Sequence, residues 1–441
     1  MIIAVNRETL SQIKNPTLAA YAEMYVTIYE NFMRQVEELG LDIEPESDRP
    51  QVQARMEQIR RKGGIFRNDD KSIYLNEISP ACVACQTGIG SATFFVSLRC
   101  HRDCFYCFNP NQEDYDYFQT HQRNVTEELK QVHDAGQRIK HLALTGGEPL
   151  LHKSEAVEFF DYATEHFPAT YTRLYTTGDH ADAETLKQLA DAGLDEIRLS
   201  IRMHDLERGH RHIYDRVALA QNYIPRVMIE MPVLPGTLDA MKEVLLDLER
   251  LKLYSINLLE FCFPLTNAQA FSARGYQLKQ QPFRVLYDYW YAGGLPVAGS
   301  ELACLELLEF ALGQQMTMGV HYCSLENKYT GQIYQQNFNQ PKPSTAYFSN
   351  RDYFLKSAKV FGADIPKVLT RFKQLGYTDY SSSQQYDYIE FHIDQIDTLK
   401  ALDVEIAIAS SVIERRADGQ YNRELQVDLV YPQSFDLAND V

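Results

Sequence analysis

Three closely spaced cysteines constrain this chain more than any other feature. They follow the apolar run Ser91 to Leu98, which predicts a strand, and their spacing is C-x3-C-x2-C. The three are Cys100, Cys104 and Cys107. Thiolates from one compact loop suit an iron-sulfur cube, and three ligands leave one iron of a 4Fe-4S cluster open. A zinc knuckle or three reduced structural thiols are the alternatives, although zinc ligands usually come as two separated halves.

The composition is that of an ordinary globular protein. The 441 residues are 45% hydrophobic and 23% charged, which suggests two or three domains or one barrel with additions. No apolar run approaches the roughly 18 to 20 residues of a membrane helix, and the start lacks a secretory signal. We therefore expect a cytoplasmic protein with no membrane partner.

Cysteine content and charge narrow the function further. Without an export signal, the eight cysteines are better explained as reduced thiols or metal ligands than as disulfides. The formal net charge of −17 opposes binding to phosphate backbones. We expect no nucleic-acid partner.

Apolar runs alternate with amphipathic stretches between Ser91 and Phe263. The predicted strands are Thr93 to Leu98, His141 to Thr145, Thr172 to Thr176, Glu196 to Ile201, Arg226 to Pro232 and Ser255 to Phe261. The predicted helices between them are Val125 to Ala135, Glu155 to His166, Ala183 to Ala192, His212 to Asn222 and Leu238 to Leu251. Such alternation predicts an α/β fold, a partial (β/α)6 TIM-like barrel with its chemistry at the carboxyl ends of the strands.

The flanking regions predict additional parts. We expect an N-terminal helical extension over residues 1–90, the barrel over 91–263, a barrel-completing, substrate-side segment over 264–337, and a small C-terminal α+β domain over 350–441. In that domain, Pro366 to Leu375 predicts a helix and Tyr386 to Ile393 a strand. Two further apolar runs predict a hairpin across Asp418-Gly419.

A second motif, Leu144-Thr145-Gly146-Gly147-Glu148-Pro149, ends the second predicted strand. Two glycines allow close approach of the backbone to a ligand, and Pro149 stiffens the exit. Together with the C-x3-C-x2-C loop on the preceding strand, it resembles the radical S-adenosylmethionine (radical SAM) superfamily. The resemblance covers about residues 91–263.

The resemblance implies a 4Fe-4S cluster on Cys100, Cys104 and Cys107 whose open iron binds S-adenosylmethionine (SAM). It also implies that Gly146, Gly147 and Glu148 hold the methionyl ammonium of SAM. An electron donor such as flavodoxin or ferredoxin would then drive cleavage of SAM to methionine and a 5'-deoxyadenosyl radical, which removes hydrogen from an unactivated carbon.

Weaker matches follow at later strand ends. The residues at these strand ends are Thr177, Asp179, Ser200, Arg202 and Glu230. We expect them, together with Tyr106 of the cysteine loop, to contact the ribose, carboxylate or adenine of SAM. The alternative for Thr177 and Asp179 is a simple turn in which Asp179 caps the next helix. Arg202 would alternatively be a surface arginine, and the ring of Tyr106 would alternatively pack in the core. His204, His210 and His212 are better explained as part of a loop and a helix start than as ligands.

The remaining cysteines leave several possibilities open. Cys82 and Cys85 form a CxxC pair that would hold half of a second metal site, completed by Cys262, Cys304 or Cys323, or they are structural thiols. Cys323 lies in a polar segment with Glu326 and Lys328. A thiol there would give a hydrogen atom to a substrate radical while Lys328 and Glu326 orient substrate, and a plain loop thiol is the alternative.

The outer motifs resemble relatives of pyruvate formate-lyase activating enzyme and peptide-modifying maturases. We expect a radical SAM enzyme with a peptide or protein substrate, as in epimerisation, crosslinking or backbone excision of a ribosomal peptide. The alternatives are a small-molecule mutase, lyase or methyltransferase, a glycyl-radical-enzyme activase, and a non-catalytic iron-sulfur sensor.

Overall fold

The computed structural model describes residues 2–209, 211–280 and 294–441, so His210 and part of the segment 264–337 lie outside the described residues. The described chain divides into two compact units. The central unit contains the described residues between 39 and 328, and the terminal unit contains residues 2–38 and 329–441. The expected N-terminal extension is therefore divided: residues 2–38 belong with the C-terminal residues, because their apolar side chains pack there.

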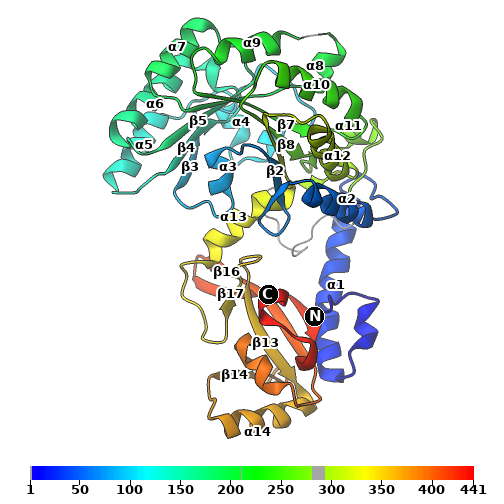
Figure 1. Ribbon diagram of the computed structural model, residues 1–441. Coiled ribbons are helices and arrows are strands. Elements are labelled where there is room, and N and C mark those ends of the chain that lie inside the picture. The colour runs from blue at the N-terminus through cyan, green and yellow to red at the C-terminus, as the bar shows by residue number, and fades with distance from the viewer. Residues whose placement is uncertain (1, 210, 281–293) are drawn as a thin grey trace. The chain divides into compact units, whose positions relative to one another are not determined.

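The central unit is built on a nine-stranded sheet of order β1-β2-β11-β8-β7-β6-β5-β4-β3 (Figure 1). Its strands are β1 (Ile65–Arg67), β2 (Ser72–Leu75), β3 (Ser91–Phe95), β4 (His141–Thr145), β5 (Tyr171–Thr176), β6 (Glu196–Leu199), β7 (Arg226–Val233), β8 (Ser255–Glu260) and β11 (Gly319–Cys323). β3 to β8 and β11 run parallel, whereas β2 is antiparallel to β11 and β1 to β2. All six predicted strands are confirmed, and β1 and β3 are the two edges of an open, partial barrel.

Helices cover the outer face of the parallel strands (Figure 1). They are α5 (Val125–Asp134), α6 (Lys153–His166), α7 (Ala183–Asp191), α9 (His212–Ala220) and α10 (Leu238–Arg250), which confirms the five predicted helices. Side-chain caps begin two of them, since Asn124 accepts from the Glu127 N–H at 3.1 Å and Asp182 from the Thr185 N–H at 2.8 Å. The core between helices and sheet is aliphatic and aromatic, as βα units require.

β11 departs from the expectation of a polar segment after the barrel. All five of its residues are buried, because the strand lies between β8 and β2 and is covered on both faces. His321 and Tyr322 are 1% and 0% exposed, and the Nε2 atom of His321 lies 2.8 Å from the Ser72 hydroxyl. The Tyr322 hydroxyl donates to Glu301 at 2.9 Å, whereas the Nδ1 atom of His321 is buried without a hydrogen-bond partner in the described structure. Most polar atoms of the two side chains are thus satisfied inside the unit, which lets a sequence with few aliphatic residues form a central strand.

Shorter elements complete the central unit. They are α2 (Arg49–Arg61), α3 (Pro80–Cys85), α4 (Tyr115–Phe118), α8 (Met203–Glu207), β9 (Cys262–Phe263), α11 (Ala268–Ser272), β10 (Leu295–Pro296) and α12 (Ser300–Gly313). α2 packs on α12, and Arg55 pairs there with Glu306 at 2.6 Å. α13 (Leu325–Asn337) begins in the central unit and continues into the terminal one.

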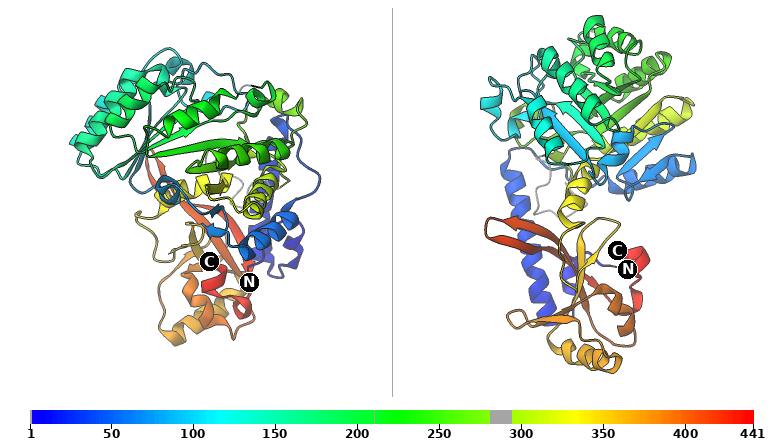
Figure 2. Two further views of the ribbon diagram at one scale, coloured as in Figure 1. Left: turned by 45° about the horizontal axis from the view of Figure 1, so that its top comes forward. Right: turned by 90° about the vertical axis from the view of Figure 1, so that its left-hand side faces the viewer.

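The terminal unit is an antiparallel sheet of order β14-β15-β13-β16-β17, with β12 on β13. Its elements are α1 (Pro16–Glu38), β12 (Tyr347–Phe348), β13 (Leu355–Phe361), α14 (Ile365–Leu375), β14 (Tyr380–Ser383), β15 (Tyr388–Phe391), β16 (Ile406–Arg416), β17 (Gly419–Val430) and α15 (Leu437–Asp440). Figure 2 shows α1 beside this sheet, and its side chains share a core with β16 and β17. α14 packs on the other face. The predicted α+β fold and the hairpin at Asp418-Gly419 are confirmed.

In the described part of the chain, no helix is long and apolar enough to cross a bilayer.

Candidate active site

The cysteine loop and the glycine turn lie against each other at the carboxyl ends of β3 and β4. The Gly147 N–H donates to the carbonyl oxygen of Ser97 at 3.1 Å, and the Glu148 N–H donates to that of Arg99 at 2.8 Å. β3 and β4 are parallel neighbours, so the segments that follow them leave the sheet at the same edge. Direct backbone bonds therefore join the two strongest motifs of the sequence.

Glycine is required at both positions of the turn. A Cβ atom on Gly147 would lie 2.0 Å from the Arg99 carbonyl oxygen, and one on Gly146 would lie 2.6 Å from that of Ser97. Gly146 also has a φ of +120°, which other residues rarely adopt. At these two positions the turn thus has backbone atoms without side chains beside the cysteine loop.

The three thiols of the loop differ in exposure but share a tendency to stay protonated. Cys100 is exposed, whereas Cys104 and Cys107 are half-buried. Burial raises the pKa of each thiol, that of Cys104 to about 11, while Arg202 opposes the rise at Cys104 and Cys100. A metal that binds sulfur would displace these protons, and Arg202 supplies positive charge beside the resulting thiolates.

These residues fit a 4Fe-4S cluster. Each thiolate of such a cube binds a different iron, so the sulfur atoms do not converge on one point. Within the described ranges, no three Cys, His, Asp or Glu side chains are grouped around a single metal-ion position. Three thiols within eight residues, next to a bare backbone strip and a buried arginine, match the donor set of a cube with one open iron.

Glu148 orders the glycine turn from within. Its side chain is buried, and it accepts hydrogen bonds from the Leu150 N–H at 2.9 Å, the Thr176 hydroxyl at 2.6 Å and the Thr177 N–H at 2.7 Å. We expected the Glu148 carboxylate to contact the ammonium group of SAM. In the structure it binds Thr176 and Thr177 and so links the turn to the end of β5. The carbonyl oxygen of Gly146 accepts from the Asn109 side chain at 2.8 Å, which ties the turn to the end of the cysteine loop.

The carboxylate of Asp179, which follows β5, binds two arginine and two histidine side chains. Its carboxylate accepts from His101 at 2.7 Å, from Arg102 at 2.6 and 2.8 Å, from His212 at 2.8 Å and from Arg202 at 3.4 Å. Burial alone would raise the pKa of Asp179, but these bonds hold it well below its usual range. Since His101 and Arg102 lie between Cys100 and Cys104, Asp179 anchors the cysteine loop.

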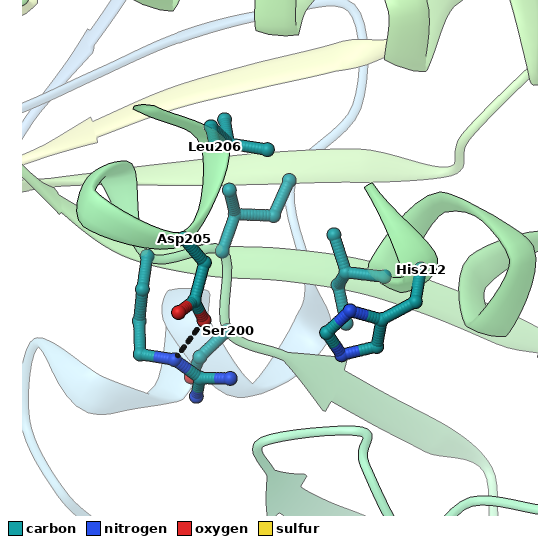
Figure 3. Close-up of a pocket in the computed structure, with 7 residues that line it drawn as sticks. Ser200, Asp205, Leu206 and His212 are labelled. Carbon is teal, nitrogen blue, oxygen red and sulfur yellow. Dashed lines mark hydrogen bonds and ion pairs between the residues drawn. The ribbon is translucent and has the colours of Figure 1, made fainter. Parts of the chain in front are cut away.

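A pocket opens beside this anchor, at the end of β6 (Figure 3). It is lined by Ser200, Ile201, Arg202, Asp205, Leu206, His212 and Ile213. Arg202 is nearly buried and donates through Nε to Asp205 at 2.9 Å, so its guanidinium bridges Asp205 and Asp179. The structure thereby brings together four predicted positions, Thr177, Asp179, Ser200 and Arg202, at one edge of the sheet.

Glu230 lies elsewhere in the sheet, in a group of polar side chains that we call the polar stripe. Its members are Glu196, Arg198, Glu230 and Asn257. Arg198 binds both Glu196 at 2.6 Å and Glu230, and Asn257 donates to Glu230 at 2.9 Å. Burial raises the pKa of Glu230, but Arg198, Asn257 and Lys328 together lower it by more, so the net shift is downward. Glu230 is therefore placed in this network and has no bond to the residues around Asp179 among those described.

Tyr106 is held by aromatic neighbours. Its ring makes edge contacts with Phe105 at 5.0 Å and Phe261 at 5.6 Å between centroids. Burial and the nearby Cys104 raise the pKa of its hydroxyl above the usual range. This is the core packing that the sequence left as an alternative, at a position one residue before Cys107.

Cys323, Glu326 and Lys328 lie where β11 ends and α13 begins. The Asn327 side chain donates to the Cys323 Sγ at 3.3 Å, and burial raises the pKa of this thiol to about 12. Burial lowers the pKa of Lys328. The thiols of Cys323 and Cys262 and the carboxylate of Glu230 raise it by a larger amount, so the net shift is upward. Cys323 is thus a buried neutral thiol at a strand end, not a loop thiol.

Several polar residues of the centre were missed from the sequence. They are His101, Arg102, Glu196, Arg198, Asn257 and His321. The sequence of β6 contained a signal for two of these residues. Glu196 and Arg198 alternate with Ile197 and Leu199, and alternate residues of a strand lie on the same face of the sheet. His212, expected as a helix start, does begin α9 but also contacts Asp179.

Comparison with known proteins identifies the family. The model of the Radical SAM superfamily matches residues 94–248, which contain both motifs and β4 to β7. Residues 94–248 are a radical SAM domain. A relative of this enzyme in Methanocaldococcus jannaschii is named a putative glycyl-radical enzyme activating enzyme. It is 25% identical over 275 residues, which span 60% of this chain and 68% of that protein.

Two further similarities concern smaller parts of the radical SAM enzyme. The PqqA peptide cyclase of Methylocella silvestris is 33% identical over 107 residues, 24% of this chain and 27% of the cyclase. The crystal structure of Streptococcus suis SuiB bound to its precursor peptide SuiA matches 39% of each chain at 15% identity, with a TM-score of 0.33.

Proposed function

We propose that this radical SAM enzyme removes a hydrogen atom from a peptide or protein substrate. The chemistry is supported by one contact above all, the backbone bonding of the cysteine loop to the glycine turn, because it puts the cluster ligands beside the carbonyls that would receive SAM. The substrate class is supported by the relatives, whose names denote action on an enzyme and on a peptide.

Each predicted residue has a task in this proposal. Cys100, Cys104 and Cys107 would hold a 4Fe-4S cluster, which, given one electron from a donor protein, would supply the reductive cleavage of SAM to methionine and a 5'-deoxyadenosyl radical. The backbone carbonyls of Gly146 and Gly147 receive the ammonium group of SAM. Glu148 keeps those carbonyls in place through its bonds to β5.

The pocket at the end of β6 would receive the polar end of SAM. Arg202 offers a nearly buried guanidinium that binds carboxylates in a fixed geometry, and Ser200 and Thr177 offer hydroxyls for the ribose. Asp179 holds Arg202 and the cysteine loop at a fixed spacing, so that cluster ligands and pocket move as one. Tyr106 and its aromatic neighbours exclude water from this side.

Deuterium transfer tests the substrate class. Reduced, reconstituted enzyme is mixed with SAM and a deuterated peptide encoded beside the gene for this chain, and the 5'-deoxyadenosine produced is analysed by mass spectrometry. We expect deuterium in that product from the peptide, and none from a scrambled peptide. Formation of 5'-deoxyadenosine without transfer from any polypeptide, but with transfer from a small metabolite, would contradict the proposal.

The matched enzyme variants are a Cys100/Cys104/Cys107→Ala triple substitution and Cys304→Ala. The first should abolish 5'-deoxyadenosine formation, whereas the second should retain it, since Cys304 is buried in α12 away from the cysteine loop. Activity in the triple variant would show that the cluster ligands are assigned to the wrong residues.

The activase function is the second candidate, favoured by the longer alignment with the Methanocaldococcus jannaschii protein. Its substrate would be a backbone glycine of a glycyl-radical enzyme. Electron paramagnetic resonance of a neighbouring candidate enzyme, incubated with this chain, SAM and reductant, should then show a glycyl radical. A peptide product without such a signal would favour the maturase instead.

A further inference from the structure

A contact between His152 and Ser97 joins the cysteine loop to the glycine turn through side chains. The Nε2 atom of His152 lies 2.8 Å from the Ser97 hydroxyl, and the two residues are only 9% and 5% exposed. Ser97 follows β3 and lies shortly before Cys100, whereas His152 follows the glycine turn and directly precedes α6. The contact therefore crosses between the two segments at a point outside both motifs.

Ser97 determines how the chain enters the cysteine loop. Its hydroxyl accepts a hydrogen bond from the Arg99 N–H at 3.3 Å, and its carbonyl oxygen accepts from the Gly147 N–H at 3.1 Å. The carbonyl oxygen of Arg99 accepts in turn from the Glu148 N–H at 2.8 Å. Any shift of Ser97 would therefore move both bonds that link the loop to the turn, together with the residue before Cys100.

The imidazole ring of His152 is held in one orientation. The side-chain nitrogen of Gln122, in the loop before α5, lies 3.0 Å from Nδ1. Burial lowers the pKa of His152 and Arg99 adds to this shift, although Glu155 opposes it, so the ring is neutral at neutral pH. With the Gln122 amide donating to Nδ1, the ring hydrogen is on Nε2 and donates to the Ser97 hydroxyl. Both ring nitrogens are thus engaged.

These bonds form a closed circuit between the two segments. It runs from His152 to Ser97, along the chain to Arg99, across to Glu148, and back to His152 through the 3-10 turn Pro149–Leu151. The glycine turn is thus attached to the cysteine loop once through the backbone and once through side chains. Two attachments fix the orientation of the turn better than one, because a single attachment still allows rotation.

We propose that His152 is a positioning residue for SAM, which acts through Ser97 to keep the glycine turn at a fixed position relative to the cysteine loop. The inference rests on the proposed function, in which SAM contacts both segments. The cluster needs the thiols of the loop alone, whereas a ligand that spans two segments also depends on their relative position. Loss of the His152 contact should therefore weaken SAM binding while the iron content is retained.

Equilibrium dialysis of the reconstituted protein against isotope-labelled SAM tests this proposal. His152→Leu removes the ring nitrogens and should raise the Kd for SAM about 10-fold, with iron per chain at the level of the unchanged protein. His152→Gln should restore most of the affinity, because its amide nitrogen can donate to the Ser97 hydroxyl. His133→Leu, on an exposed histidine of α5, is the matched control and should leave the Kd unchanged.

Ser97→Ala tests the same contact from its other side. It should also raise the Kd for SAM. Adding His152→Leu to Ser97→Ala should raise the Kd little further, because the contact is already lost. Ser97→Ala removes only one oxygen atom, so it provides the measurement if His152→Leu does not fold.

Two kinds of failure can be told apart. An unchanged Kd in His152→Leu, a Kd that His152→Gln does not restore, iron lost in parallel with SAM binding, or fully additive effects of the two substitutions would each overturn the proposal. A reconstituted unchanged chain that holds a cluster but binds no SAM would contradict the proposed function, and this inference with it.

Discussion

The Glu148 N–H donates a hydrogen bond to the carbonyl oxygen of Arg99 at 2.8 Å, which joins the turn after β4 to the residue just before Cys100. The bond couples two motifs that lie far apart in the sequence. It also explains why the position before Glu148 must be glycine, since any side chain there would enter the cysteine loop.

Gly147→Ala should therefore disrupt the centre. The added Cβ would lie 2.0 Å from the Arg99 carbonyl oxygen, a backbone atom that cannot turn away. We expect a loss of about 1–3 kcal/mol in unfolding free energy and lower iron retention after reconstitution. Gly313→Ala is the control, because no atom lies within 4 Å of its added Cβ. Equal iron content in the two variants would show that the contact is not needed.

Asp179→Asn should loosen the cysteine loop. The amide keeps no negative charge for Arg102 and Arg202, and it has one acceptor oxygen in place of the two that bind two arginines and two histidines. We expect about 1–3 kcal/mol lower stability in urea and faster loss of cluster absorbance in air. Asp191→Asn removes an exposed carboxylate paired with Lys187 and should change neither measurement.

Arg198→Met should destabilise the central unit strongly. It leaves the carboxylates of Glu196 and Glu230 without their cation, and the Glu196 side chain is fully buried. The expected loss is about 3–5 kcal/mol in urea unfolding, because an uncompensated buried charge remains. Arg250→Met, on a side chain 68% exposed, is the comparison. A loss no larger than that of the control would show that water solvates the stripe.

Asp428→Asn should stabilise the terminal unit at neutral pH. Burial raises the pKa of Asp428, although Gln426 and the Val5 N–H oppose the rise. The folded state then binds more protons than the unfolded state just above the ordinary aspartate pKa of about 4, so stability falls as pH rises through that window. The amide oxygen can still accept from Val5, without the charge.

Thermal unfolding across pH measures this effect. The stability curve of Asp428→Asn should lie above that of the unchanged chain at pH 7 and meet it in acid. Asp397→Asn, an exposed pair with Lys400, should follow the unchanged chain throughout. A variant curve that lies below at neutral pH would mean that the ionised form is stabilised by the fold.

The parallel sheet and its six βα units were predictable because their apolar periodicity is strong. β11 was not, since His321 and Tyr322 resemble a polar loop until β8 and β2 are placed on either side. α1 lies in the expected helical extension, but its packing against β17 follows from contacts distant in sequence.

The sequence by itself determined that the cysteine loop and the glycine turn meet at one edge of the sheet. Thiol spacing is local, and parallel βα units bring successive strand ends to one edge, so the cysteine loop and the glycine turn had to meet. Only the tertiary structure decided which polar groups are already engaged, as with Glu148 and Asp179, and which thiols are buried, as with Cys323. Such pairings depend on the register and packing of elements far apart in the chain, and local residue patterns carry no information about them.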